Sequence, residues 1–149
     1  MTWLFDINVL LAIVDPLNPF HRTIHNWLGE HKNAGWATCP ITENGFVRIL
    51  AQPKYRGARR TAPEAIELLR SMKAEALQSH VFWADDCSIS DSESVMHERL
   101  VAPSQITDVY LAALALRHGG RFLTFDRGIP WQCIRGASSE LVEIPRAVI

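Results

Sequence analysis

Four acidic residues stand where a folded chain could bring carboxylates together. Asp6 and Asp126 each directly follow a short apolar run, and Glu43 and Asp108 each lie near the start of a longer apolar stretch. Neighbouring carboxylates raise one another's pKa, and a divalent cation relieves that repulsion. Oxygen ligands without histidine or cysteine at matching spacing favour Mg²⁺, with Mn²⁺ as a substitute, over zinc. A site of this kind suits the hydrolysis of phosphodiesters.

The chain around these acids alternates between short apolar runs and helical patterns. The runs predict strands at residues 3–5, 36–39, 81–83 and 121–125, with an edge strand at 141–144. Apolar spacing predicts helices at residues 8–14, 20–32, 40–51, 62–78 and 105–118. The sequence Ser90-Asp91-Ser92-Glu93 resembles a helix N-cap and predicts a further helix at residues 90–100. This alternation is typical of a mainly parallel sheet, so we expect an α/β fold, a three-layer α/β/α domain that spans residues 1–149.

A parallel sheet would gather the four acids at one edge. Ligands bind outside the carboxyl ends of parallel strands, and a helix that follows such a strand begins near that edge. The acids have a simpler explanation individually, because the helix dipole favours Glu43 and Asp108 in a first turn and Asp6 suits a turn. Their repetition at four such positions favours one shared crevice.

Composition restricts the class of protein. A formal net charge of −1 and 48% hydrophobic residues predict a globular protein in which any nucleic-acid contact depends on local positive charge. Three scattered cysteines without CxxC spacing favour reduced thiols over a disulfide framework or a zinc site. The amino-terminal apolar run is too short for a signal peptide, and no apolar window is long enough to span a membrane. We therefore expect a cytoplasmic protein without a membrane partner.

Four segments also resemble a known family. These segments are Leu4–Leu11, Thr42–Arg48, Ile106–Ala115 and Leu123–Gly128. In order and spacing they resemble the motifs of the PIN-domain nucleases. Within that family the chain most resembles the VapC toxins of toxin–antitoxin pairs. The resemblance implies an Mg²⁺-dependent endoribonuclease with a PIN-like fold, which acts as a toxin on RNA. It further implies a cognate VapB-like antitoxin and a homodimer.

The resemblance also assigns roles to residues. It implies that Asp6 and Asp108 are the principal metal ligands, and that Glu43 and Asp126 complete the catalytic pocket by holding a second ion or positioning the water. Asn8 and Thr124 would orient carboxylates through hydrogen bonds. A local turn or cap is an equally good reading of Asn8. This chain departs from the family at Ile7, where a hydroxyl residue usually follows the first acid.

Several polar residues outside the four acids could also bind RNA or a metal. Lys54, Arg56, Arg59 and Arg60 form a cationic run that a solvated surface explains more simply than an RNA contact. Arg127, directly after Asp126, is better placed to contact a phosphate. Asp85 and Asp86 also follow a predicted strand, but the pattern favours a loop. His21 and His25 have metal-pair spacing without a third ligand, which favours an ordinary helix face.

Other functions use some of the same residues. Asp6 could be the nucleophile of a phosphatase or the acceptor of a phosphorylation switch. A haloacid-dehalogenase-like phosphatase requires a second Asp where this chain has Asn8, and a receiver-type switch requires adjacent acids and a late Lys that do not appear. A PIN ribonuclease of RNA processing that is not a toxin is a further alternative. An inactive PIN-like scaffold is disfavoured by the intact acid set.

Overall fold

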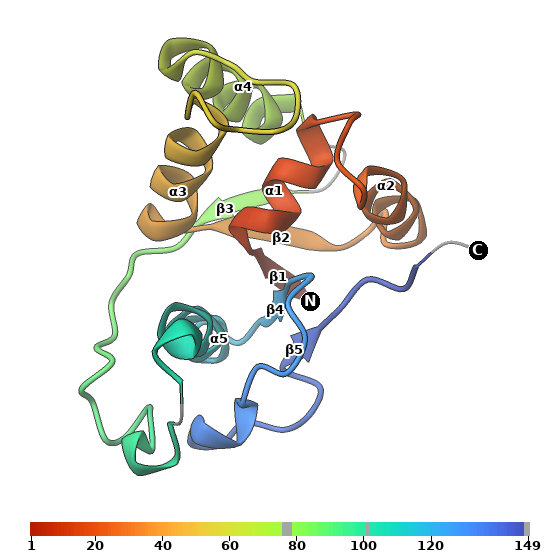
Figure 1. Cartoon of the computed structure of the whole chain (residues 1–149). Coiled ribbons are helices and arrows are strands. Elements are labelled where there is room, and N and C mark those ends of the chain that lie inside the picture. The colour runs from red at the N-terminus through yellow and green to blue at the C-terminus, as the bar shows by residue number, and fades with distance from the viewer. Residues whose placement is uncertain (76–78, 101, 148–149) are drawn as a thin grey trace.

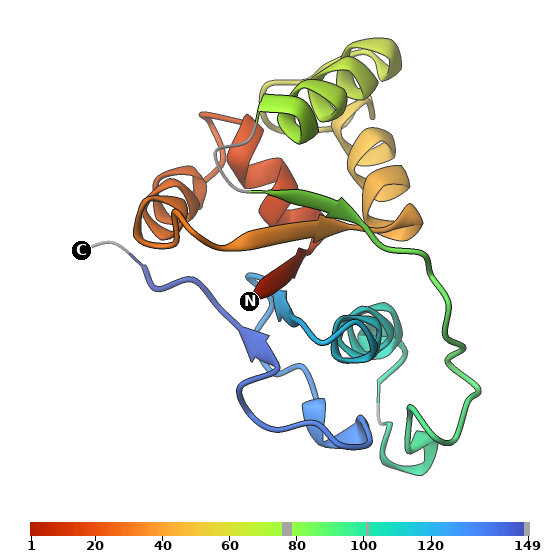
Figure 2. The same cartoon turned by 180° about the vertical axis from the view of Figure 1, so that it is seen from behind.

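A five-stranded sheet forms the centre of the computed structural model, which describes residues 1–75, 79–100 and 102–147. The strand order is β3-β2-β1-β4-β5, and every neighbouring pair is parallel. The strands are β1 (Thr2–Phe5), β2 (Gly35–Thr38), β3 (His80–Phe82), β4 (Arg121–Leu123) and β5 (Val142–Glu143). The predicted parallel sheet and its edge strand are confirmed, and Figures 1 and 2 show the molecule from the front and from behind, with the sheet between two layers of helices.

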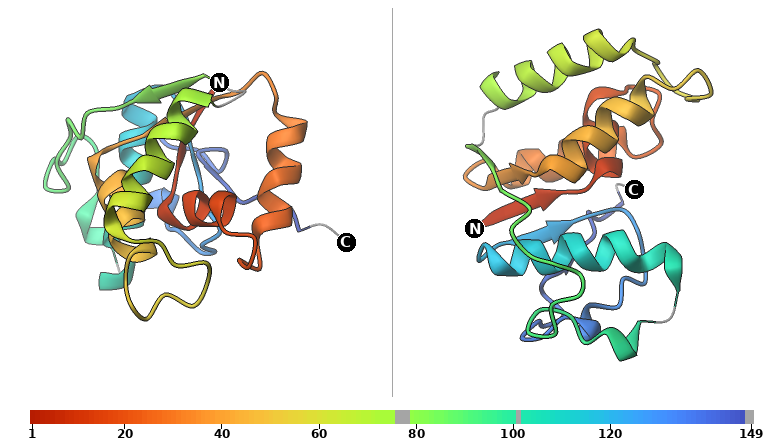
Figure 3. Two further views of the ribbon diagram at one scale, coloured as in Figure 1. Left: turned by 90° about the horizontal axis from the view of Figure 1, so that it is seen from above. Right: turned by 90° about the vertical axis from the view of Figure 1, so that its left-hand side faces the viewer.

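Helices cover both faces of this sheet. Four of them pack above it in Figure 1 and one packs below. The four are α1 (Ile7–Val14), α2 (His21–Glu30), α3 (Pro40–Leu50) and α4 (Ala62–Glu75), and the fifth, on the other face, is α5 (Ile106–Arg117). The right-hand view in Figure 3 separates the three layers most clearly. The three-layer α/β/α architecture is therefore confirmed.

The alternation of side chains along β1 explains why the sheet has two cores. Trp3 and Phe5 pack with the residues of α1–α4, whereas Leu4 between them packs with the residues of α5. Successive side chains of a strand point to opposite faces, so an uninterrupted apolar run buries on both sides. The strand that precedes Asp6 is thus held rigidly from above and below, which fixes the position of this carboxylate.

The predicted helix at residues 90–100 is wrong. Asp91 instead caps a turn, accepting from the backbone N–H of Glu93 at 3.0 Å and from the hydroxyl of Ser94 at 3.0 Å. Val95 then forms an antiparallel bridge with Ile134. Backbone groups in this bridge cannot also form the hydrogen bonds of a helix. The contact with Ile134 therefore prevails over the local capping pattern. Only a three-residue 3₁₀ helix, His97–Arg99, remains there.

The remaining boundaries differ little from expectation. The helix predicted over 62–78 is described as far as Glu75, and residues 76–78 lie outside the described part of the chain. The three cysteines are free thiols. No helix in residues 1–75, 79–100 or 102–147 is long and apolar enough to cross a lipid bilayer.

Candidate metal centre

Three of the four predicted acids meet at the carboxyl edge of the sheet. One carboxylate oxygen from each of Asp6, Asp108 and Asp126 lies within 4.8 Å of the other two. Asp6 follows β1, Asp126 follows β4, and Asp108 lies in the first turn of α5. The backbone N–H of Asp6 donates to the carbonyl of Leu123 at 3.0 Å, so the β1–β4 pairing continues up to the cluster. The fold thereby brings residues 6, 108 and 126 together.

The geometry of the cluster fits a small divalent cation. Opposite oxygens in an octahedral Mg²⁺ site are about 4.2 Å apart. Since at least two of the three oxygen pairs would have to be neighbours, about 3.0 Å apart, the three oxygens, which lie within 4.8 Å of one another, would draw together on binding one ion. Asp6 is 5% exposed, Asp108 is half-buried and Asp126 is exposed, so the cluster opens toward solvent on one side. The donors are all carboxylate oxygens, which is the set that hard cations prefer.

The hydroxyl of Thr124 lies at the centre of a hydrogen-bond network beneath the acids. It donates to Oδ2 of Asp6 at 2.6 Å. It accepts from the backbone N–H of Asp126 at 3.0 Å and from Nδ2 of Asn8 at 3.3 Å. A threonine hydroxyl offers one donor and two acceptor lone pairs, so its capacity is used completely. Thr124 therefore orients one carboxylate and fixes the backbone of another.

Asn8 acts over a long range rather than as a local cap. Its Oδ1 accepts from the backbone N–H of Phe125 at 3.2 Å, while its Nδ2 donates to Thr124. The Asn8 amide therefore forms hydrogen bonds with the segment after β4 rather than a local turn or cap. Asp6 supplies the cap instead, because its Oδ1 accepts from the N–H of Ile7 at 2.7 Å.

Ile7, the departure from the family pattern, packs away from the acids. A Cβ atom added to Gly45 of α3 would lie 2.2 Å from Cδ1 of Ile7. The side chain of Ile7 thus occupies the space that the glycine leaves on the facing helix. A hydroxyl residue at this position would not fill it, so the substitution serves the packing of α1 against α3.

Burial controls the ionisation of two acids in the cluster. Desolvation raises the pKa of Asp6 to about 7, with smaller contributions from the charges of Asp108 and Asp126, although the Thr124 hydrogen bond opposes the rise. Desolvation and the charge of Asp126 raise the pKa of Asp108 to about 6. Perturbed carboxylates that share one cleft are typical of functional sites. A cation placed among them would restore full ionisation.

Glu43 lies outside this group of three. Its Oε1 accepts from the hydroxyl of Thr38 at 2.6 Å and from Nζ of Lys73 at 2.8 Å. Burial, together with the charge of Lys73, lowers the pKa of His80 to about 4. The ring is therefore neutral, and its Nε2 lies 2.8 Å from the Thr38 hydroxyl. Three of the four predicted acids thus come together, and the fourth is part of a polar cluster formed by residues of β2, α3, α4 and β3.

Lys73 was not identified from the sequence. It lies in the last turn of α4, where a basic residue has the ordinary explanation of a favourable helix dipole. Nothing in its local spacing points to Glu43, which is 30 positions away. The packing of α3 against α4 creates this pair, and only a three-dimensional structure reveals it.

The cationic run belongs to a loop that Asp15 fastens at the far end of α1. Asp15 is 1% exposed and accepts from the Tyr55 hydroxyl at 2.6 Å and from the N–H of Ala58 at 3.2 Å. Burial alone would raise the pKa of Asp15, but these hydrogen bonds and that of Leu17 lower it. Since α1 has eight residues and is about 12 Å long, the loop lies roughly one helix length from Asp6.

The four cations of this loop have different environments. Lys54, Arg56, Arg59 and Arg60 are all exposed. Arg59 donates to the carbonyls of Ala51 and Gln52 and so closes the carboxyl end of α3. It therefore has a structural function that the sequence pattern did not suggest. Arg127 is exposed directly beside Asp126.

Asp86, His21 and His25, which the sequence pattern did not assign to the site, have partners outside the acid cluster. Asp86 lies in a loop and pairs with Arg117 and His118, each at 3.1 Å. His21 and His25 hydrogen-bond to the carbonyls of Ala12 and Ile13. The histidines thus join α2 to α1, and the structure agrees with their reading as an ordinary helix face.

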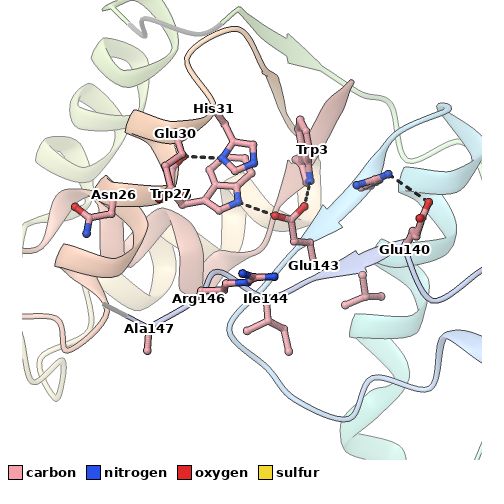
Figure 4. Close-up of a pocket in the computed structure, with 12 residues that line it drawn as sticks. Trp3, Asn26, Trp27, Glu30, His31, Glu140, Glu143, Ile144, Arg146 and Ala147 are labelled. Carbon is pink, nitrogen blue, oxygen red and sulfur yellow. Dashed lines mark hydrogen bonds and ion pairs between the residues drawn. The ribbon is translucent and has the colours of Figure 1, made fainter. Parts of the chain in front are cut away.

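Two pockets help to place the centre on the surface. A pocket of about 430 Å³ adjoins Asp126 and is also lined by Trp131 and Gln132. A larger one, of about 910 Å³, is lined by none of the four acids. In Figure 4 the Glu143 carboxylate of this larger pocket lies between Trp3 and Trp27 and accepts from both indole N–H groups, at 2.7 and 2.8 Å. These two hydrogen bonds join β1, α2 and β5, which indicates a structural role for Glu143.

Comparison with known proteins agrees with this geometry. The family model described as the PIN domain matches residues 4–130. Ribonuclease VapC44 of Mycobacterium tuberculosis (strain ATCC 25618 / H37Rv) is 42% identical over 140 residues, which are 94% of this chain and 96% of the relative. Ribonuclease VapC39 of the same strain is 38% identical over 149 residues, covering 97% of this chain and 99% of the relative.

Solved structures show the same fold at low sequence identity. The crystal structure of VapBC2 from Rickettsia felis, bound to a promoter DNA fragment, contains a chain with a TM-score of 0.60 and 13% identity, over 97% of this chain and 98% of that one. FitAcB from Neisseria gonorrhoeae gives a TM-score of 0.55 and 18% identity, over 89% of this chain and 93% of that one. At this level of identity the likeness concerns the fold alone.

Proposed function

The chain belongs to the PIN-domain family, and we propose that it is a metal-dependent endoribonuclease that acts as the toxin of a toxin–antitoxin pair. The observation that carries the proposal is the meeting of Asp6, Asp108 and Asp126 within 4.8 Å at the carboxyl edge of a parallel sheet. Relatives named ribonucleases that are 38–42% identical over almost the whole chain support the same activity.

In this proposal the three aspartates bind one Mg²⁺, for which Mn²⁺ can substitute. The bound ion would lower the pKa of an attacking water and stabilise charge on the phosphate. Thr124 and Asn8 hold the buried Asp6 carboxylate and the backbone of the segment that carries Asp126. The participation of Glu43 stays a prediction. Its Oε2 accepts no hydrogen bond within the described residues and is the oxygen available for such a role.

The surface offers cations for the RNA backbone. We assign the phosphate contact nearest the cluster to Arg127, which is exposed beside Asp126. Lys54, Arg56 and Arg60 project from the loop at the far end of α1 and suit a more distant phosphate. Arg59 is the weakest candidate, since its guanidinium already binds the carbonyls of Ala51 and Gln52, just after α3.

A nucleophilic role for Asp6 is disfavoured by its surroundings. The residue is 5% exposed, and both carboxylate oxygens accept hydrogen bonds, Oδ1 from Ile7 and Oδ2 from Thr124. A nucleophile for phosphoryl transfer needs an oxygen that can approach phosphorus in line with the leaving group. An acid held in this way is better suited to binding a cation.

The biological partner follows from the resemblance to VapC toxins. We propose a VapB-like antitoxin that neutralises the nuclease, and a homodimer as the assembled form. Expression of the protein alone should arrest growth, and co-expression of the small protein encoded beside it should relieve the arrest. Normal growth with active nuclease present would favour an RNA-processing enzyme that is not a toxin.

The chemistry is tested with purified protein and total RNA. We expect cleavage with Mg²⁺ or Mn²⁺, none in EDTA, and full recovery when the metal is restored. Asp6→Asn and Asp108→Asn should each abolish cleavage while the fold is retained. Asp86→Asn is the matched control, because Asp86 is a loop acid paired with Arg117 and should leave cleavage unchanged. Cleavage by both cluster variants at the wild-type rate would refute the site.

A further inference from the structure

Two phenylalanine rings stack beside the acid cluster. The rings of Phe20 and Phe125 have centroids 4.3 Å apart and an interplanar angle of 14°. Phe125 is half-buried and packs against the core of α1–α4, whereas Phe20 is 46% exposed. The pair therefore rests on the core through one ring and presents the other to solvent. An exposed aromatic ring held by a second ring is a stable planar surface.

The backbone joins this pair directly to the candidate metal centre. Phe125 lies between Thr124 and Asp126, and its N–H donates to Oδ1 of Asn8 at 3.2 Å. The Asn8 amide that binds the Thr124 hydroxyl thus also holds the backbone of Phe125. The N–H of Phe20 donates to Oδ1 of Asn18 at 2.9 Å, which closes a turn before α2. Phe125 thus directly precedes Asp126 in the chain, and its ring contact with Phe20 brings that second ring to the same part of the surface.

Packing alone does not account for the exposure of Phe20. A large apolar ring left half in water forgoes hydrophobic stabilisation of about 25 cal/mol for each Å² that it exposes. An unpaired nucleobase covers such a ring in a sequence-tolerant way. The neighbouring carboxylates, with their ion, would bind the phosphate of the same strand. The position beside the cluster therefore favours a base of the substrate over a partner protein as the occupant.

We propose that the Phe20–Phe125 stack is a platform for one unpaired base of the RNA, next to the phosphate that is cleaved. This inference rests on the proposed ribonuclease function and adds to it a residue that contacts a base of the substrate. Phe20 is then a binding residue for the base, and Phe125 supports it.

The test combines protein variants with altered RNA. Phe20→Leu keeps apolar volume and removes the ring, and Phe20→Trp keeps an aromatic face. Leu17→Ala is the matched control, since Leu17 is 71% exposed in the same connection between α1 and α2. The substrates are an RNA oligonucleotide that spans a mapped cleavage site and a series in which one nucleotide at a time is abasic. KM and kcat are measured for each combination in Mg²⁺.

We expect Phe20→Leu to raise KM about 5- to 150-fold with little change in kcat, because stacking is uniform binding energy. Phe20→Trp and Leu17→Ala should resemble the wild type. One abasic position beside the cleaved bond should weaken binding by the wild type to the same extent. At that position Phe20→Leu should cause no further loss, which identifies the base that contacts the ring.

Three results would overturn the platform. These are an unchanged KM for Phe20→Leu on intact RNA, an equal loss for Leu17→Ala, and abasic losses that add fully to the Phe20→Leu loss at every position. In each case cleavage by the wild type would leave the proposed function standing. Absence of metal-dependent cleavage by the wild type would instead refute the proposed function, and the platform with it. If Phe20→Leu fails to fold, the abasic substrates are compared between the wild type and Phe20→Trp. The platform is then overturned if no abasic position weakens binding to either protein.

Discussion

The Thr124 hydroxyl donates a 2.6 Å hydrogen bond to Oδ2 of Asp6 across 118 positions of the sequence. It joins the end of β1 to the segment after β4 and leaves Asp6 held through both of its carboxylate oxygens. A ligand fixed in this way binds a cation without first losing rotational freedom. The orientation of Asp6 therefore depends on a residue that needs no contact with the ion.

Thr124→Val should weaken metal binding while leaving the acids in place. Valine has nearly the shape of threonine but cannot donate to Asp6 or accept from Asn8. Loss of such an orienting partner typically costs about 10- to 100-fold in metal affinity. The measurement is the Mg²⁺ concentration that gives half-maximal cleavage. Thr124→Ser, which retains the hydroxyl, is the control and should stay close to the wild type; equal losses in both variants would assign the effect to packing.

Asp108→Asn should stabilise the metal-free protein. Burial and the charge of Asp126 raise the pKa of Asp108 to about 6, so its ionised form opposes folding at neutral pH. After allowance for partial solvent exposure, the neutral amide should raise the free energy of unfolding by about 1–2 kcal/mol. Thermal denaturation in EDTA at pH 7.5 measures this difference. Added Mg²⁺ should stabilise the wild type more than the variant, and a gain of the same size in both would contradict the assignment of Asp108 as a ligand.

The ionisation of Asp6 should make stability depend on pH. Its pKa is raised to about 7 in the folded state, above the unfolded value. Between about pH 4 and 7 the folded state therefore binds more protons, and stability falls as pH rises through this range. Burial lowers the pKa of His80 to about 4, and this contributes the opposite slope. The informative quantity is thus the difference between wild type and Asp6→Asn.

In EDTA, Asp6→Asn should gain stability relative to the wild type as pH rises, by at most about 4 kcal/mol between pH 4.5 and 8. Urea denaturation at several pH values measures the free energy of unfolding of both proteins. Asp86→Asn serves as the control, because an exposed loop carboxylate should not reproduce the trend. Parallel curves for wild type and Asp6→Asn would show that burial does not perturb this group.

Much of the fold could be predicted because its signals are local. Short apolar runs such as that before Asp6 form strands buried on both faces, and the apolar face of residues 106–117 forms α5. The two strand-end acids and Asp108 also meet as expected, since parallel strands place their carboxyl ends on one edge. These features follow from residue type and period alone.

The sequence does not reveal contacts between distant segments, and one of them makes a predicted helix wrong. The capping pattern at Asp91 predicts a helix, but pairing of Val95 with Ile134 takes the backbone instead. Glu43 has the sequence position of a cluster acid, yet Lys73 binds it from another helix. Asp15 looks like part of a helix stop, and only the fold reveals it as the buried acceptor for the loop that carries Tyr55. No local pattern encodes these pairings.

Gly57→Ala should disturb the loop that Asp15 fastens. A Cβ atom at Gly57 would lie 1.7 Å from Oδ2 of Asp15, the oxygen that binds the Tyr55 hydroxyl. Because Asp15 is buried, it cannot move away freely, and we expect a loss of about 1–3 kcal/mol in the free energy of unfolding. Gly29→Ala in α2 is the matched control, since no atom of the described residues lies within 4 Å of its added Cβ. Urea denaturation should find this control neutral or more stable by up to about 1 kcal/mol.

Glu43 and Lys73 allow the catalytic and structural roles of one carboxylate to be separated. Glu43→Gln and Lys73→Met both break the 2.8 Å ion pair between α3 and α4, so both should destabilise the protein by a similar amount. If Glu43 also contributes charge to the acid cluster, Glu43→Gln alone should reduce RNA cleavage, and we expect a loss of at least about tenfold. Lys73→Met keeps the carboxylate and should retain most activity. Cleavage rates in saturating Mg²⁺, measured well below the melting temperature of both variants, make the comparison. Equal rates would restrict Glu43 to the polar cluster with Thr38 and His80, and the metal centre would then consist of the three aspartates.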